Sequence, residues 1–142
     1  MEGKNQSHEI KFTIVGTHDS PDANPIPYKR LTQKMKYTSR GVEYEHWKAH
    51  VVKAFLDSLD RQAQQPYIRN LQLKRKPIAL QPNQKARLTV HIRFKDEKHG
   101  DPDNVAKGIN DALFIDDKHV DITTHHECRC KYGEADVTIT FI

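Results

Sequence analysis

The sequence has few cysteines and no long apolar segment, and both shortages narrow the classes of protein to consider. Its 142 residues include two cysteines, Cys128 and Cys130. Two positions apart on an extended strand, their side chains point the same way, which does not suit a disulfide. No segment approaches the roughly 18 apolar residues of a membrane span, and the start, MEGKNQSHE, lacks the apolar stretch of a signal peptide. We therefore expect a soluble cytoplasmic protein with reduced thiols and no membrane partner.

The chain is also short for two domains, because about 100–200 residues usually make one. Hydrophobic residues make up 36% of the sequence and charged residues 30%, a polar composition that still suits a globular protein. We expect one domain over residues 1–142, with residues 1–8 as a flexible tail.

Charge is distributed unevenly along the chain. The sequence has 23 Lys and Arg against 19 Asp and Glu, a net charge of +4. Residues 96–121 contain eight acids and three bases, which leaves 20 bases and 11 acids elsewhere, a net charge of +9. An acidic site on a basic surface is typical of a metal-dependent enzyme that acts on a polyanion, although a basic face that is merely solvated is the plainer alternative.

Hydrophobic periodicity predicts the order strand, helix, strand, helix, strand, strand. Apolar residues alternate in the strand segments and recur every three or four positions in the helical ones. Between the first strand and the first helix lies a long, proline-containing basic loop. The fold class expected is α+β, with a small mixed sheet of about four strands and two main helices. The predicted strands are 9–15, 87–95, 118–131 and 135–142, and the predicted helices are 39–59 and 103–114.

The second predicted helix has acidic residues at both ends. Asp101 and Asp103 flank a proline at its start, and Asp116-Asp117 follows its end. We expect Asp103 to cap the helix and Lys107, one turn on, to share a face with neighbouring acids. One interpretation is therefore a solvated helix with a ladder of ion pairs.

The alternative is a metal site. Proline makes the turn into the helix stiff, and packing of the next strand on the helix would bring Asp116-Asp117 back toward Asp101 and Asp103. Converging carboxylates repel unless a cation neutralises them. All-oxygen ligands favour Mg²⁺, or Mn²⁺ in its place, and such a site can hydrolyse phosphodiesters with Lys107 offsetting the developing charge.

A second segment, HHECRC at residues 125–130, contains potential zinc ligands. On an extended strand His126, Cys128 and Cys130 would point inward while His125 points outward. Tetrahedral zinc needs a turn that a strand lacks. We therefore expect no zinc there and interpret these side chains as buried packing.

The acidic motif resembles that of the RusA-type Holliday-junction resolvases, crossover junction endodeoxyribonucleases of bacteria and prophages. The resemblance consists of DPDN from Asp101, Lys107, DAL from Asp111 and DD at Asp116-Asp117. The segment NPIPYKR, residues 24–30, is similar to a degraded form of the family's basic loop. One departure is that only two residues separate DAL from DD, where some members have several more.

The resemblance implies a magnesium-dependent endonuclease that cuts a four-way junction symmetrically in DNA recombination and repair. It implies a homodimer with one active site for each of two strands. It also implies that Asp101, Asp103 and Asp117, with Asp116 beside it, hold the metal, and that Lys107 is the essential base. Asn104 and Asp111 would have supporting roles.

Several basic residues are candidate phosphate contacts. Two alternatives stay open: a noncatalytic protein that binds branched DNA, and a nuclease of broader specificity for flaps or forks. The predicted phosphate contacts are Lys29, Arg30, Lys34, Lys36, Arg40, Lys74, Arg75 and Lys76.

Overall fold

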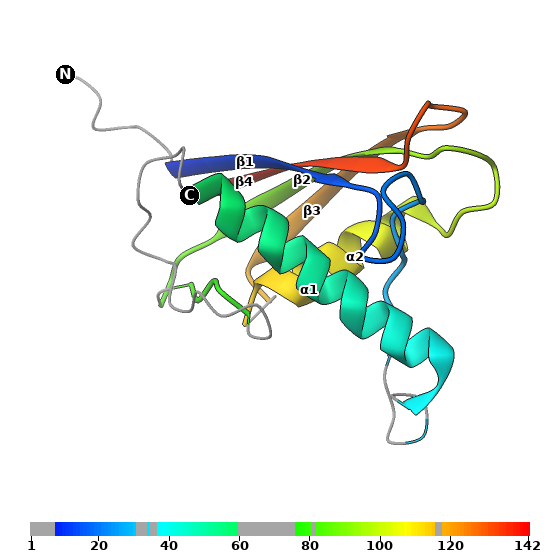
Figure 1. The fold of residues 1–142 in the computed structure, drawn as a ribbon. Helices are drawn as coiled ribbons and strands as arrows, with labels where there is room; N and C mark the ends of the chain where they lie inside the picture. The colour runs from blue at the N-terminus through cyan, green and yellow to red at the C-terminus, as the bar shows by residue number, and fades with distance from the viewer. Residues whose placement is uncertain (1–7, 31–33, 35–36, 60–75, 81, 116–117) are drawn as a thin grey trace.

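The computed structural model describes residues 8–30, 34, 37–59, 76–80, 82–115 and 118–142. They form a mixed sheet of four strands and two helices (Figure 1), which confirms the predicted α+β class and the order of its elements. The predicted tail, residues 1–8, lies outside the described residues except that the first strand begins at His8. The elements are β1 (His8–Val15), α1 (Ser39–Leu59), β2 (Ala86–Arg93), α2 (Pro102–Leu113), β3 (Val120–Glu127) and β4 (Glu134–Phe141).

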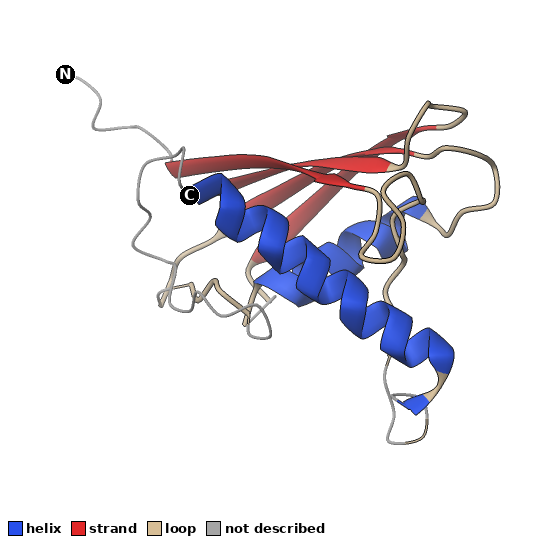
Figure 2. Cartoon of the chain, viewed as in Figure 1, coloured by secondary structure: helices blue, strands red, loops and turns tan. Residues whose placement is uncertain are grey.

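The sheet has the strand order β1-β4-β2-β3. Strand β4 lies between β1 and β2 and pairs with both in antiparallel orientation, whereas β2 and β3 are parallel. Parallel neighbours need a crossover connection, which here contains α2. Figure 2 shows both helices on the same side of the sheet. Neither has the length and apolar character to cross a bilayer, within the part of the chain that the structure describes.

The core lies between the helices and this face of the sheet. Alternate residues of β1, β2 and β4 point into it, as their period of two dictates. Helix α1 contributes a stripe at three- and four-residue spacing, and full burial of one such side chain stabilises the fold by about 1.5–3 kcal/mol. The fully buried side chains include Ile10, Ile14, Tyr44, Trp47, Val51, Phe55, Leu88, Val90, Ile92, Ile109, Leu113 and Ile139.

Helix α1 begins at Ser39, as predicted, whereas the cap of α2 differs from the prediction. The Thr38 hydroxyl accepts a hydrogen bond from the backbone N–H of Gly41 (3.1 Å), so Thr38 caps α1. Asp101 rather than Asp103 caps α2, because Pro102 takes the first helical position, where its missing N–H costs nothing.

Strand β3 lies at the edge of the sheet and is more exposed than predicted. It ends at Glu127, four residues before the predicted end. Ile122 is 39% exposed and His126 is exposed, whereas Cys128 and Cys130 are half-buried. The expectation of buried packing was therefore wrong for His126. Cys128 does pack against the edge of the core, and its thiol donates to the backbone oxygen of Asp96 (3.0 Å).

Candidate active site

The first turn of α2 presents two carboxylates to solvent. Asp101 and Asp103 are both exposed, and an Oδ1 atom of Asp101 accepts the backbone N–H of Asp103 (3.0 Å). No ion pair joins either carboxylate to a cation among the described residues. The N-terminal end of a helix carries partial positive charge, which favours an acid there by about 0.3–1 kcal/mol. The two acids thus have helix-end stabilisation, but their charges are not neutralised by a described side chain.

A hollow beside this turn brings α2 and β3 together. Its volume is about 530 Å³, and Asp103 and Lys107 line one wall. The opposite wall comes from the first half of β3, because that strand runs back alongside α2. Asp103 and Lys107 therefore share one hollow, in agreement with the helix face on which the sequence placed both. The lining residues are Asp103, Asn104, Lys107, Asn110, Val120, Ile122 and Thr124.

Lys107 does not form the predicted ladder with its acidic neighbours. Its Nζ lies 4.4 Å from the centroid of the Tyr28 ring, a cation–π contact. Within the described ranges it makes no ion pair with Asp103 or Asp111. Its charge is held over an aromatic face and is not cancelled by a described carboxylate.

The basic segment 24–30 crosses α2 at this point. The backbone N–H of Tyr28 donates to the carbonyl of Asn104 (2.8 Å). Gly108 makes the close approach possible, because a Cβ there would lie 3.2 Å from the Tyr28 nitrogen. Asn24 holds the other end of the segment, since its Oδ1 accepts the backbone N–H of Lys95 (2.6 Å) and its Nδ2 donates to Asp96 (3.0 Å).

Because Tyr28 is hydrogen-bonded to α2, the predicted phosphate contacts that follow it in the chain begin next to the first turn of this helix. Lys29, which is half-buried, and Arg30, which is exposed, follow Tyr28 directly in the chain. Lys34 and Arg40 are exposed further along, toward the start of α1. Because that end of α1 extends away from the sheet (Figure 1), these bases spread the positive charge over a longer surface. The predicted contacts Lys36, Lys74 and Arg75 lie outside the described residues.

Asp111 belongs to a different network, which links α2 to α1 and to Lys76. Its Oδ2 accepts the Tyr44 hydroxyl (3.0 Å) and lies 3.7 Å from Lys48 Nζ, and its Oδ1 accepts Lys76 Nζ (3.2 Å). Burial alone would raise the pKa of Asp111, but the charge and hydrogen bond of Lys76, the Tyr44 hydroxyl and the charge of Lys48 outweigh it and lower the pKa. Burial, followed by the Asp111 charge, raises the pKa of Tyr44. Asp111 thus joins α1, α2 and the segment before β2, and Lys76 serves it as a partner.

Asn110 was not singled out as a site residue from the sequence. It is only 3% exposed and lines the hollow with Asp103 and Lys107, and no described residue donates a hydrogen bond to its Oδ1. A buried amide oxygen without a partner costs free energy, so its position calls for a donor or a cation. Its spacing, seven positions after Asp103, is the signal that places both on one face of the helix.

The donor set of this turn fits Mg²⁺ in chemistry. Asp101 and Asp103 offer oxygen atoms only, as Mg²⁺ prefers, and Asn110 has a buried amide oxygen two turns further along the same hollow. The predicted ligand Asp117 and its neighbour Asp116 lie outside the described residues. In the described part of the chain, Asp101 and Asp103 do not belong to any group of three ligand side chains close enough to share an ion.

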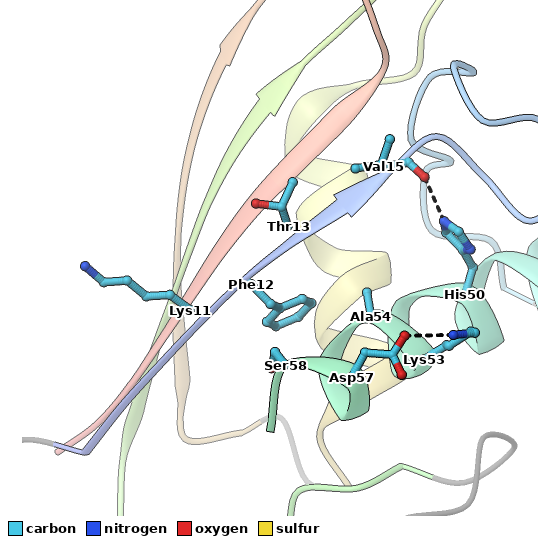
Figure 3. Close-up of a pocket in the computed structure, with 9 residues that line it drawn as sticks. All are labelled: Lys11, Phe12, Thr13, Val15, His50, Lys53, Ala54, Asp57 and Ser58. Carbon is cyan, nitrogen blue, oxygen red and sulfur yellow. Dashed lines mark hydrogen bonds and ion pairs between the residues drawn. The ribbon is translucent and has the colours of Figure 1, made fainter. Parts of the chain in front are cut away.

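A larger pocket, of about 710 Å³, lies between β1 and α1 (Figure 3). Asp57 is the only acid that lines it, and its carboxylate pairs with Lys53 (2.7 Å). His50 points toward the end of β1, where its Nε2 lies 2.9 Å from the carbonyl oxygen of Val15. Among the described residues that line this pocket, each acid, lysine and histidine has a partner, so the smaller hollow remains the candidate site.

Comparison with known proteins gives no family for the chain. No protein-family model matches it, and no curated protein matches it. The resemblance to the RusA-type resolvases therefore rests on the motif residues quoted above.

Proposed function

We propose that the chain is a magnesium-dependent endodeoxyribonuclease that resolves Holliday junctions in recombination and repair. The observation that carries the proposal is the meeting of three features at the start of α2. Two exposed carboxylates without a described counter-ion stand beside Lys107, and a basic segment crosses the same turn. Acidic ligands for a metal and bases for phosphates are the two requirements for hydrolysis of a polyanion.

In this proposal each residue has a separate task. Asp101 and Asp103, together with Asp117, hold Mg²⁺, which supplies Lewis-acid activation of the phosphoryl group and of the attacking water. Lys107 offsets the charge that develops on the phosphate, and its contact with Tyr28 keeps the ammonium group close to α2. Lys29 and Arg30 bind the backbone of the strand to be cut.

The proposal includes a homodimer, because symmetric resolution of a four-way junction needs two cuts. Each subunit would supply one complete set of acids and one Lys107. The cut strands would then be nicked at related positions on opposite arms.

Cleavage of a labelled four-way junction, with linear duplex as control, tests the activity. The assay compares the native protein in Mg²⁺ and in EDTA with Asp103→Asn and with Asp57→Asn, an exposed aspartate of the other pocket. We expect paired symmetric nicks in the junction alone, lost with EDTA and with Asp103→Asn and kept with Asp57→Asn. Cleavage by Asp103→Asn at the native rate would refute the site.

Two further results would redirect the proposal to its alternatives. Tight binding of the junction by the native protein without any cut in Mg²⁺ would leave a noncatalytic binding protein. Equal cleavage of flaps, forks and four-way junctions would leave a nuclease of broader specificity.

Salt dependence tests the basic segment separately. Replacing Lys29 and Arg30 together by glutamine should reduce the slope of log affinity against log salt by about 1.4–1.8, since each phosphate contact contributes about 0.7–0.9. Lys53→Gln, in the pocket of Figure 3, is the matched control and should leave the slope unchanged. An unchanged slope in the double variant would remove these residues from the interface.

A further inference from the structure

A cluster of two histidines and one aspartate lies outside the candidate active site. Asp19 Oδ1 is 3.0 Å from His18 Nδ1 and 3.9 Å from His46 Nδ1. The two imidazole rings are tilted by 37°, with their centroids 4.6 Å apart. Atoms that can act as ligands, one from each residue, all lie within 4.8 Å of one another. From this geometry we propose that His18, Asp19 and His46 bind a divalent transition metal such as Zn²⁺.

The spacing of the ligand atoms suits such an ion. Tetrahedral zinc with bonds of about 2.0–2.1 Å holds its ligand atoms about 3.3 Å apart. The two separations from Asp19, 3.0 and 3.9 Å, lie on either side of this value, and all three ligand atoms lie within 4.8 Å of one another. All three side chains are exposed, so side-chain rotations can bring the ligand atoms to the tetrahedral spacing. Imidazole and carboxylate ligands favour zinc, copper or nickel, whereas Mg²⁺ prefers oxygen ligands alone. The remaining coordination positions would be filled by water.

Both sides of the cluster are held by backbone structure. His18 and Asp19 are the central residues of a turn in which the N–H of Thr17 donates to the carbonyl of Ser20 (2.7 Å). The Thr17 hydroxyl accepts the N–H of Ser20 in return (3.2 Å). Gly16 begins this turn in the left-handed region with φ of 60°, where a side chain would collide with Ser20. The turn is therefore positioned before any ion binds.

The third ligand comes from α1, which the core stripe fixes against the sheet. His46 precedes the buried Trp47 and lies one turn before His50. His50 in turn contacts the carbonyl oxygen of Val15, directly before the loop that carries His18 (Figure 3). A bound ion would cross-link the connection after β1 to α1, and closing a loop of this length stabilises the folded state.

The proposed zinc site is separate from the predicted Mg²⁺ site and from residues 125–130, HHECRC, where no zinc is expected.

Zinc binding to metal-free protein, measured by calorimetry, tests the proposed zinc site. We expect one zinc ion per chain at this cluster. Affinity should fall at least about tenfold in His18→Ala and in His46→Ala, since each removes a direct ligand. It should be unchanged in Asp103→Asn and in His125→Ala, an exposed histidine of β3.

Thermal unfolding gives an independent readout that also shows whether each variant folds. Metal-free native protein and metal-free His46→Ala should unfold at similar temperatures, because His46 is exposed. Zinc should raise the unfolding temperature of the native protein and not that of His46→Ala. Absence of zinc binding to the native protein, or equal affinity in native and His46→Ala, would overturn the proposal.

Discussion

Replacing Asp111 by alanine should destabilise the protein far more than the loss of an ordinary surface acid. The buried Tyr44 hydroxyl would lose its acceptor, which costs about 1–3 kcal/mol. The ion pairs with Lys48 and Lys76 are partly exposed, with side-chain exposures of 23% and 41%, and each contributes about 0.2–1 kcal/mol. We therefore expect the free energy of unfolding to fall by about 2–4 kcal/mol.

Urea denaturation at pH 7 measures this change, and Asp57→Ala is the matched control. Asp57 pairs with Lys53 on the exposed face of α1, at a spacing of four residues. Loss of this ion pair should therefore lower the free energy of unfolding by only about 0.2–0.5 kcal/mol. Tyr44→Phe completes a double-mutant cycle with Asp111→Ala and should give a coupling energy of about 1 kcal/mol. If Asp111→Ala costs no more than Asp57→Ala, the assignment of Asp111 to stability is refuted.

The contribution of Asp111 to the free energy of unfolding should depend on pH. Because the pKa of Asp111 is lower in the folded protein than in the unfolded chain, where it is about 3.9, its contribution is fully present above that value. The contribution is lost as the pH falls through the folded pKa. The stability difference between the native protein and Asp111→Asn should therefore shrink as pH falls from about 6 to 3. A difference that stays constant over this range would contradict the network.

Three further predictions concern neighbouring charges, and unfolding in urea measures each of them. Asp101→Ala should cost about 1 kcal/mol through the lost cap of α2. Asp103→Asn should change stability by less than about 0.5 kcal/mol, because lost helix-end stabilisation is offset by relief of repulsion from Asp101, while junction cleavage is abolished. Arg93→Met should cost about 1–2 kcal/mol, because Arg93 donates two hydrogen bonds to Asp136 (2.7 and 3.0 Å). The hydrogen bonds from Arg93 lower the pKa of Asp136, although burial opposes them. Arg93→Met should therefore also lose less stability than the native protein as the pH becomes acidic.

Local pattern was sufficient for most of the fold. Alternation predicted β2 and β4 within two residues, since the inward face of a half-buried strand is determined by its own side chains. It failed for β3, which is exposed on most positions, although β1, the other edge strand, buries alternate residues in the core. How far other elements cover a strand depends on tertiary packing, which local alternation does not show. Asp101 rather than Asp103 is the cap because the proline between them occupies the first helical position.

The candidate site was predictable only in part, because its components are distant in the chain. Spacing along α2 predicted that Asp103 and Lys107 share a face of the helix, and in the structure both line one hollow. It could not reveal that Tyr28 lies beneath Lys107, or that Asp111 turns away toward Tyr44, since both depend on how other segments pack against the helix.

The position of β4 has a consequence for synthesis of the protein on the ribosome. This strand is the last of the described elements to be made, yet it separates β1 from β2 and pairs with both. Until it emerges, β1 and β2 have no strand between them to pair with. A nascent chain would therefore contain every acid of the candidate site before the sheet that supports α2 is complete. Loss of β4 should accordingly abolish cleavage, although no residue of that strand contacts the hollow.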